Sequence, residues 1–272
     1  MDASHLFWHL IRFVALWAIA ASQAFSGTID PNVPDAKYVE FGRKFSCVVM
    51  LRAECLTVPE GVKVPEGKRL VQWGSAVIIR PHWILTAAHV VIDAENHHIV
   101  INKKDFPLRT IIKHPDFDEE KMGYFDLALG YSPQDFALEF YCPLYTAQDE
   151  LNQAVTIAGY GITGTFATGG VNTDNLRRAG HSQITGIEHN VLVCRPKRGR
   201  KFPLEFLITP GDSGGGLFIG NSLAGINSFL LAADGKPDGT YTDEGAHTRI
   251  SLYADWINQT IEQYEAEHGP QK

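Results

Sequence analysis

The sequence predicts an all-β protein, a sandwich or barrel of many short strands, that ends in one α-helix. From residue 45 onward, short runs rich in Val, Ile and Phe are separated by Gly, Pro, Asn and Asp. This is the usual pattern of strands joined by tight turns, and no repeat of fixed period interrupts it. The clearest runs are CVVML (47–51), SAVII (75–79), HIVI (98–101), LALG (127–130), AVTIAG (154–159), VLVC (191–194), LFIG (217–220) and LAGINSF (223–229).

The one clear helix covers residues 251–268, which read SLYADWINQTIEQYEAEH. Its apolar side chains recur at helical spacing on one face, which indicates packing against the strands. Ser251 is the candidate N-cap, because its hydroxyl can accept a hydrogen bond from the first turn. Asn258 begins the sequence Asn-Gln-Thr, a glycosylation acceptor in cells that glycosylate.

The composition is that of an ordinary globular protein. Of 272 residues, 44% are hydrophobic and 20% are charged, with 25 Gly and 14 Pro. These figures exclude a collagen-like, a coiled-coil and a disordered chain. The formal net charge of −7 argues against general binding to nucleic acid. Removal of a 24-residue leader from 272 leaves 248 residues, enough for one large β domain or two small ones.

Residues 1–24 are predicted to be a secretory signal peptide that is cleaved after Ala24. Arg12 precedes a short apolar core, 13–21, and small residues follow it, which is the layout of such a leader. The core is too short to span a bilayer comfortably; an uncleaved signal anchor over residues 6–21 is the alternative. The prediction is an extracellular or periplasmic protein with no membrane contact after cleavage.

Export makes the four cysteines candidates for disulfide bonds. They are Cys47, Cys55, Cys142 and Cys194. Four cysteines allow three pairings, and the sequence alone does not choose among them. Cys47 with Cys55 would staple a hairpin, and Cys142 with Cys194 would then join distant segments. Four buried thiols are the alternative.

Three short motifs carry residues suited to nucleophilic catalysis. They are TAAH (86–89), FDLAL (125–129) and GDSGG (211–215). A serine hydroxyl is a weak nucleophile and needs an adjacent base, usually a histidine. A carboxylate then fixes the tautomer of the histidine and stabilises its charged form. His89, Asp126 and Ser213 supply one group each and are the candidate catalytic residues.

In these motifs and their order, the chain resembles the trypsin-like (chymotrypsin-fold, S1 family) serine peptidases, as a divergent member. The separation is 37 positions from His89 to Asp126 and 87 from Asp126 to Ser213. The resemblance implies two packed antiparallel six-stranded β-barrels with a C-terminal α-helix. The implied units are an N-terminal segment or propeptide (25–44), a first barrel (45–140), a second barrel (141–250) and the helix (251–268). The matching segments are WGSAVIIRPHWILTAAHV (73–90), IIKHPDF (111–117), FDLAL (125–129), AGYG (158–161), GDSGGGLF (211–218), LAGINSF (223–229) and GAHTRISLYADWI (245–257).

The resemblance also implies a role for each residue of the site. Ser213 would attack the scissile carbonyl of a polypeptide and form an acyl-enzyme. His89 would act as general base and then general acid, and Asp126 would orient it. The backbone N–H groups of Gly211 and Ser213 would form the oxyanion hole, and Asp212 would order that hole by pairing with a freshly liberated α-amino group. The implied protein is a secreted serine endopeptidase, a hydrolase that needs no cofactor and no metal.

The start of the mature chain departs from that family. No Ile-Val-Gly-Gly sequence follows a basic residue, and the corresponding region reads GTIDPNVPDAKYVEFG (27–42). Ile29 and Val33 are candidate N-termini, and a basic side chain is the alternative partner of Asp212. Five basic residues lie within 195–201. They indicate a solvated loop, with an exosite for acidic partners or a self-cleavage point as the alternative.

The substrate pocket implied by the resemblance also departs from the family. Members that cleave after Arg or Lys carry an acid six residues before the nucleophile, where this chain has Leu207, followed by Ile208. A cation against Leu207 would be buried unpaired, at a cost of several kcal/mol, so cleavage after Arg or Lys is not expected. Leu230 stands where the family usually has Gly and would narrow the pocket, which predicts a preference for small or medium apolar residues. The other implied walls are Asn227, Ser228, Phe229, Gly245, Ala246 and His247.

Two other functional classes compete with the peptidase. The GDSGG run also fits the nucleophile elbow of an esterase, but its glycines disfavour the helix that such an elbow needs. A catalytically silent binding protein with the same fold is the second alternative. No metal site is predicted, because His89, His97 and His98 lack a convincing ligand spacing. The predicted partners are a polypeptide substrate and a proteinaceous inhibitor, with no nucleic acid, and the chain is predicted to be a monomer.

Overall fold

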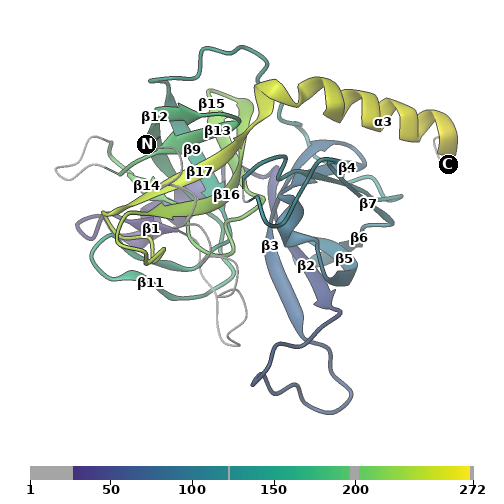
Figure 1. Cartoon of the computed structure of the whole chain (residues 1–272), viewed down its shortest axis with the longest axis horizontal. Helices are drawn as coiled ribbons and strands as arrows, with labels where there is room; N and C mark the ends of the chain where they lie inside the picture. Colours follow the sequence, from purple (N-terminus) through teal and green to yellow (C-terminus); the bar gives the residue numbers. More distant parts are fainter. Residues whose placement is uncertain (1–26, 122, 197–201, 270–272) are drawn as a thin grey trace, which may run out of the picture.

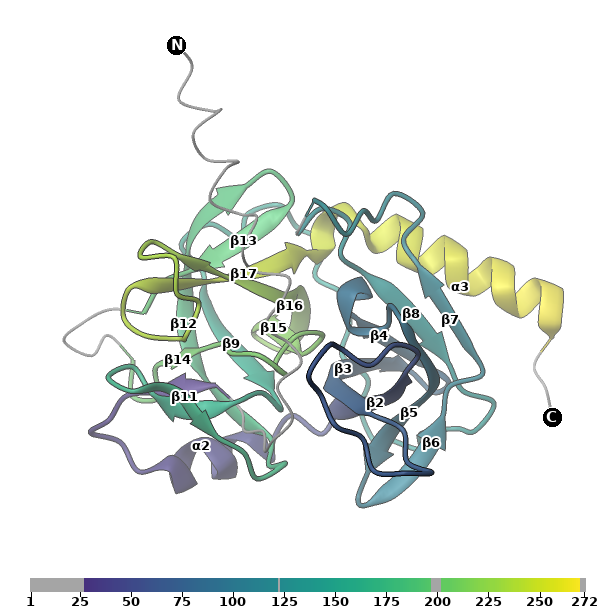
Figure 2. The same ribbon diagram turned by 60° about the horizontal axis from the view of Figure 1, so that its bottom comes forward.

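The computed structural model describes residues 27–121, 123–196 and 202–269. Two barrel-like sheets lie side by side, and helix α3 (Ala254–His268) extends along the first of them (Figure 1, Figure 2). The predicted all-β class with a C-terminal helix is confirmed. The predicted leader and residues 197–201 of the basic loop lie outside the described residues. No helix within the described ranges has the length and apolar character needed to cross a membrane.

The first sheet has seven strands and remains an open half-barrel, where the resemblance implied a closed barrel of six. Its order is β6-β5-β2-β3-β4-β8-β7. The internal strand β4 has all four residues buried, because β3 and β8 pair with its two edges and α3 packs against its Trp83 side chain. Trp83 in β4 donates its indole N–H to Glu265 of α3 at 2.9 Å. The strands are β2 (Val48–Cys55), β3 (Val71–Arg80), β4 (Trp83–Thr86), β5 (Ala94–Ile101), β6 (Lys104–Pro107), β7 (Thr110–Lys113) and β8 (Ala128–Tyr131).

The second sheet closes into the six-stranded barrel that the resemblance implies. Its order is β12-β13-β17-β16-β15-β9, and pairing of β12 with β9 closes the ring. The interior of this barrel holds Ile157, Leu192 and Leu217, all fully buried. The strands are β9 (Ala154–Gly159), β12 (Arg178–Glu188), β13 (Val191–Cys194), β15 (Gly216–Ile219), β16 (Ser222–Ala232) and β17 (Asp243–Arg249).

The N-terminal segment is built into the second half of the molecule. Strand β1 (Thr28–Ile29) lies between β10 (Thr163–Thr165) and β14 (Phe206–Leu207), and β11 (Gly169–Asn172) completes this small sheet. The short helix α2 (Asp35–Gly42) follows. Ile29 and Val33, the candidate N-termini, are only 4% and 5% exposed. Freeing either one as a new terminus would therefore require β1 to leave its sheet.

A buried arginine attaches α2 to the second barrel. The Arg178 side chain in β12 is 2% exposed and donates hydrogen bonds of 2.6 and 2.7 Å to the two carboxylate oxygens of Asp35. It donates two more, of 2.9 and 2.8 Å, to Asp174. A buried guanidinium needs such bidentate partners to offset its lost hydration.

The beginning of the C-terminal helix differs from the prediction. Residues Ile250–Leu252 form a short 3₁₀ turn (η3), and α3 begins at Ala254 without a side-chain cap. Ser251 is therefore not the N-cap. Its hydroxyl donates instead to the carboxylate of Glu150 at 2.6 Å. The two residues are about 100 positions apart, so the local sequence pattern does not indicate this contact.

The four cysteines are buried free thiols in the structure. Cys47 lies just before β2, and Cys142 lies in the segment that connects β8 to β9. Their Sγ atoms are 2.6 Å apart. Cys55 in β2 points its thiol at Gln72, and Cys194 lies in β13 of the second barrel. The structure therefore brings together neither Cys47 with Cys55 nor Cys142 with Cys194.

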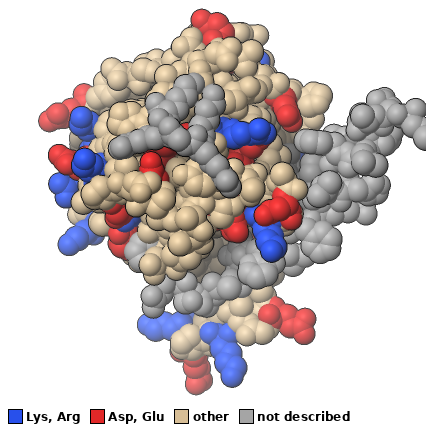
Figure 3. Space-filling view, turned by 90° about the vertical axis from the view of Figure 1, so that its left-hand side faces the viewer, with Lys and Arg blue, Asp and Glu red and all other residues tan. Residues whose placement is uncertain are grey.

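Charges of both signs share the face of the second barrel shown in Figure 3. On this face, Lys and Arg are interspersed with Asp and Glu rather than gathered into a patch of one sign (Figure 3). An anionic polymer approaching this side of the described chain meets repulsive and attractive groups together.

Candidate active site

His89 follows the buried strand β4 and sits in the 3₁₀ turn η2 (Ala88–Val90), at the rim of the first sheet. Thr86 ends the strand and donates its hydroxyl to the carbonyl of Ser75 at 2.8 Å, which ties this end of β4 to β3. The imidazole is 26% exposed, although its neighbours Ala88 and Val90 are buried. The buried side chains of Ala88 and Val90 therefore anchor this turn in the core, while the His89 ring between them reaches the surface.

Asp126 lies two residues before β8 and is almost fully buried, with 2% of its side chain exposed. Its Oδ2 lies 2.8 Å from His89 Nδ1, and its Oδ1 accepts the His89 backbone N–H at 3.0 Å. The hydroxyl of Ser228 donates a further hydrogen bond to Oδ2. Because the carboxylate accepts the proton of Nδ1, Nε2 of the neutral ring carries the lone pair that a general base needs.

The same contacts shift both pKa values. Burial alone raises the pKa of Asp126, but the charge of His89 and the hydrogen bonds from His89 and Ser228 outweigh it and leave this pKa below its usual value. Burial lowers the pKa of His89, but the charge of Asp126 and its hydrogen bond outweigh burial and leave this pKa above its usual value. The pair therefore combines an ionised carboxylate with a histidine of increased basicity.

Ser213 lies in the turn before β15, and Ser228 links it to the other two residues. The Ser213 hydroxyl donates to the carbonyl oxygen of Ser228 at 3.1 Å, while the Ser228 side chain binds Asp126. Among the described residues, no hydrogen bond joins Ser213 directly to His89. Sequence reasoning placed Ser228 only in the pocket wall. Its contact with Asp126 spans 102 positions, which no local pattern reveals.

The turn around Ser213 requires glycine. Gly214 has a φ of +85°, and a Cβ there would lie 2.0 Å from the carbonyl oxygen of Ser75 and 2.1 Å from the Thr86 hydroxyl. Gly211 has a φ of +93°, and its carbonyl accepts the Ser75 hydroxyl at 2.9 Å. Within the described chain, the N–H groups of Gly211 and Ser213 have no protein acceptor. Both donors are therefore available to a ligand.

Asp212 is fully buried beneath this turn. Its Oδ1 accepts the N–H of Gly161 at 2.8 Å, and its Oδ2 accepts the N–H and the hydroxyl of Thr209 at 2.9 and 3.1 Å. The N–H of Gly27 donates to the same Thr209 hydroxyl at 3.2 Å. Thr209 thus connects Gly27, directly before β1, to the carboxylate predicted to pair with an N-terminus.

The predicted pocket residues divide into two groups. A Cβ on Gly245 would lie 3.4 Å from both Ile208 and Leu207, and Leu230 pairs with Gly245 across β16 and β17. These four residues come together. The ring of Phe229 instead packs against Gly123. A Cβ added to Gly123 would lie 2.4 Å from a carbon of this ring. Asn227 also departs from the expectation, because its amide points inward to the carbonyls of Ala158 and Asp212.

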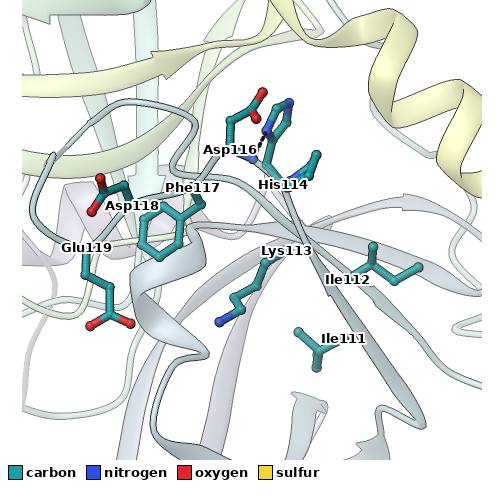
Figure 4. A pocket seen from close by; sticks show the side chains of 9 residues that line it. Ile111, Ile112, Lys113, His114, Asp116, Phe117, Asp118 and Glu119 are labelled. Carbon is teal, nitrogen blue, oxygen red and sulfur yellow. Dashed lines mark hydrogen bonds between the residues drawn. The ribbon is translucent and has the colours of Figure 1, made fainter.

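An open hollow of about 820 Å³ lies elsewhere, over β7 and the loop that follows it, residues 111–119 (Figure 4). None of the candidate catalytic residues lines it. Its His114 accepts the Asp116 backbone N–H at 3.2 Å and stacks on Phe125, with ring centres 4.8 Å apart. Through this stacking, the loop supports Phe125, the residue directly before Asp126.

No group of three or more His, Cys, Asp or Glu in the described ranges is arranged to hold a metal.

The trypsin family model matches residues 61–257 of the chain. Duodenase-1 of Bos taurus is 26% identical over 208 residues, which cover 69% of this chain and 78% of duodenase-1. Kallikrein-15 of Homo sapiens is 29% identical over 216 residues, covering 68% of this chain and 80% of the kallikrein.

Solved structures of similar fold agree with this match. The structure of neuropsin, a serine protease expressed in the limbic system of mouse brain, superposes with a TM-score of 0.62 at 18% identity, over 81% of this chain and 96% of neuropsin. HL collagenase gives a TM-score of 0.60 at 21% identity, over 80% of this chain and 94% of the collagenase. These identities establish the fold. With the family model covering well over half of its length, the chain belongs to the trypsin family of serine peptidases.

Proposed function

We propose that the protein is a secreted serine endopeptidase in which Ser213, His89 and Asp126 are the catalytic residues. The observation that carries this proposal is the Asp126–His89 pair, with an Nδ1 to Oδ2 distance of 2.8 Å, next to a serine in a glycine turn. A buried carboxylate that fixes the imidazole leaves Nε2 as a base at the surface.

The proposed reaction begins with transfer of the Ser213 hydroxyl proton to His89 Nε2. The Ser213 oxygen attacks the carbonyl carbon of the substrate, and the N–H groups of Gly211 and Ser213 donate to the resulting oxyanion. His89 then protonates the leaving amine, and water hydrolyses the acyl-enzyme by the same steps in reverse. In the free protein, Ser213 donates to Ser228 instead. Catalytic hydrogen bonds often form only when substrate is bound, so a rotation of the Ser213 side chain precedes attack.

The substrate is a polypeptide cleaved at a site other than Arg or Lys. Leu207 and Ile208 are 1% and 3% exposed, and neither offers a partner for a buried cation. Secretion is proposed on the leader at residues 1–24 and agrees with the extracellular setting usual for proteins of this family.

A fluorophosphonate probe tests the proposal, because it reacts only with an activated serine. The protein secreted from the full chain is expected to be labelled, and Ser213→Ala is expected to abolish labelling while circular dichroism remains unchanged. The matched control is Ser251→Ala, which removes a hydroxyl remote from the site. Failure to label folded, secreted protein would instead support the silent binding protein with the trypsin fold.

A further inference from the structure

The proposed catalytic steps do not use one buried histidine near the pocket residues. His247, on β17, is fully buried, and its Nδ1 lies 2.9 Å from Oδ1 of Asn227. Its Nε2 is also buried, and within the described part of the chain it has no hydrogen-bond partner. Buried polar atoms are nearly always paired, so an unpaired one calls for an explanation.

The hydrogen bonds of Asn227 determine which nitrogen of His247 carries the proton. The Asn227 amide nitrogen donates to the carbonyls of Ala158 and Asp212, each at 3.1 Å, so its Oδ1 is left to accept from His247 Nδ1. In the neutral ring, Nε2 then presents a lone pair. Burial lowers the pKa of His247 to about 3. The ring is therefore neutral near pH 7, and Nε2 is an acceptor.

This acceptor faces the group formed by Leu207, Ile208 and Gly245. Nε2 lies 3.0 Å from the point that a Cβ on Gly245 would occupy, and a carbon of each apolar side chain lies 3.4 Å from the same point. Because residue 245 is a glycine, it places no side chain between the buried Nε2 and the apolar side chains of Leu207 and Ile208.

We propose that His247 is a specificity-determining residue, whose Nε2 accepts a hydrogen bond from the substrate side chain at P1, the residue whose carbonyl Ser213 attacks. The selected side chains end in a neutral N–H or O–H donor, that is, an amide or a hydroxyl. A neutral ring lacks the charge that a P1 carboxylate needs, and the apolar walls lack the acid that Lys or Arg needs. This inference rests on the proposed function. It modifies the purely apolar preference expected from the sequence.

Matched peptide substrates that differ only at P1 test this inference. The pairs are Asn with Leu, Gln with Met, Thr with Val, and Tyr with Phe, in which one member carries a donor and the other is its apolar isostere. For the pair that fits the pocket, kcat/KM is expected to favour the donor by roughly tenfold or more, because a site built around a hydrogen bond rejects the analogue that lacks it. Peptides with Arg, Lys or Glu at P1 are expected to be poor substrates.

Two variants connect the preference to His247. His247→Leu removes the acceptor and is expected to bring the donor-to-isostere ratio close to one, whereas His247→Gln supplies a carbonyl acceptor and is expected to restore part of it. If wild-type protein reacts with the fluorophosphonate but prefers the apolar member of every pair, this inference fails and the proposed function stands. If the wild type does not react, both fail.

A second inference comes independently from the cysteines. Cys47 and Cys142 are 4% and 5% exposed, and their sulfur atoms lie 2.6 Å apart, not much farther than the about 2.05 Å of a disulfide bond. The hydrogen bond from Cys142 lowers the pKa of Cys47, with a further contribution from the charge of Arg177. Cys47 is thus the thiol better suited to act as the attacking thiolate.

We infer that Cys47 and Cys142 form a disulfide bond in the exported protein. The two thiols lose two protons and two electrons, and an oxidised dithiol, such as the disulfide of an exported oxidoreductase, takes up the electrons and is reduced to two thiols. The bond closes a loop across 95 positions. It joins the start of β2 to the segment that leads from the first sheet to the second barrel.

Peptide mapping without reduction tests the bond. Protein secreted from the full chain is denatured and alkylated. It is expected to yield one crosslinked peptide containing Cys47 and Cys142, with Cys55 and Cys194 alkylated. Cys47→Ser removes the bond and is expected to lower Tm by about 10 °C, to the value of reduced wild type. The matched control is Cys55→Ser, which leaves the bond intact and is expected not to show this decrease. Alkylation of all four cysteines before reduction, or a crosslink through Cys55 or Cys194, would overturn the inference.

Discussion

Asp126→Asn is expected to lower kcat on a peptide substrate by about 10⁴-fold. The amide has no charge to stabilise the imidazolium, and its N–H₂ group can donate to His89 Nδ1. The proton then moves to Nε2, which can no longer accept from Ser213. The effect is large because His89 Nδ1 lies 2.8 Å from Asp126 and its backbone N–H binds the same carboxylate.

The matched control for this variant is Asp116→Asn, ten positions earlier in the same loop. Asp116 is exposed and binds His114 only through its backbone N–H, so kcat is expected to stay at the wild-type value. A folded Asp126→Asn protein that retains wild-type kcat would contradict the proposed role of this carboxylate.

The pH dependence of kcat/KM provides a second measurement on the same pair. Protonated His89 cannot accept the proton of Ser213, and its raised pKa keeps it protonated up to a higher pH than usual. Activity is therefore expected to fall on the acid side with a midpoint above the ordinary value of 6.5. In Asp126→Asn the charge that raises this pKa is gone while burial still lowers it. The midpoint of the residual activity is therefore expected to move to lower pH.

Arg249→Leu is expected to destabilise the fold by about 3–5 kcal/mol, because it leaves a buried carboxylate without its partner. Glu150 is fully buried, and Arg249 donates hydrogen bonds of 2.8 and 2.7 Å to its two oxygens. For a domain of this size, the loss corresponds to a decrease in Tm of about 10 °C or more, measurable by calorimetry or circular dichroism.

The double variant Arg249→Leu with Glu150→Leu is the control, because it removes both charges. Replacing a buried ion pair by apolar side chains is often neutral, so most of the lost stability is expected to return. A double variant as unstable as Arg249→Leu alone would show that packing, rather than the unpaired charge, causes the loss.

Acid is expected to remove the contribution of this ion pair in the wild type. Burial raises the pKa of Glu150, but hydrogen bonds from Arg249 and Ser251 outweigh burial and leave it below the ordinary value of 4.5. A carboxyl group with a lowered folded-state pKa stabilises the fold above the unfolded pKa, and this stabilisation is lost as pH falls through the folded value. The Tm difference between wild type and Arg249→Leu is therefore expected to shrink at acid pH.

The sequence predicted those features that residues close together in the chain encode. Runs such as WILT (83–86) alternate with turn residues. This alternation indicates that the runs are strands, whichever neighbouring strand each of them pairs with. His89, Asp126 and Ser213 were identifiable as candidate catalytic residues because each lies in a short motif, and the three motifs occur in the order of the family that the chain resembles. The helix at 251–268 was predictable from its spacing, but its first turn was not, because Ser251 binds Glu150 instead of capping the helix.

The sequence by itself thus determined the all-β class, the order of the motifs and the candidate catalytic residues, since all of these depend on local periodicity and on contiguous residues. Only the tertiary structure decided that the first sheet stays open, that Ser228 supports Asp126 and that Cys47 meets Cys142. It also decided that His247 binds Asn227, 20 positions earlier, and that its other ring nitrogen has no partner within the described chain. The physical reason is distance along the chain. Contacts between residues that are tens to about a hundred positions apart form when the sheets close and pack. The spacing of neighbouring residues in the sequence does not predict them.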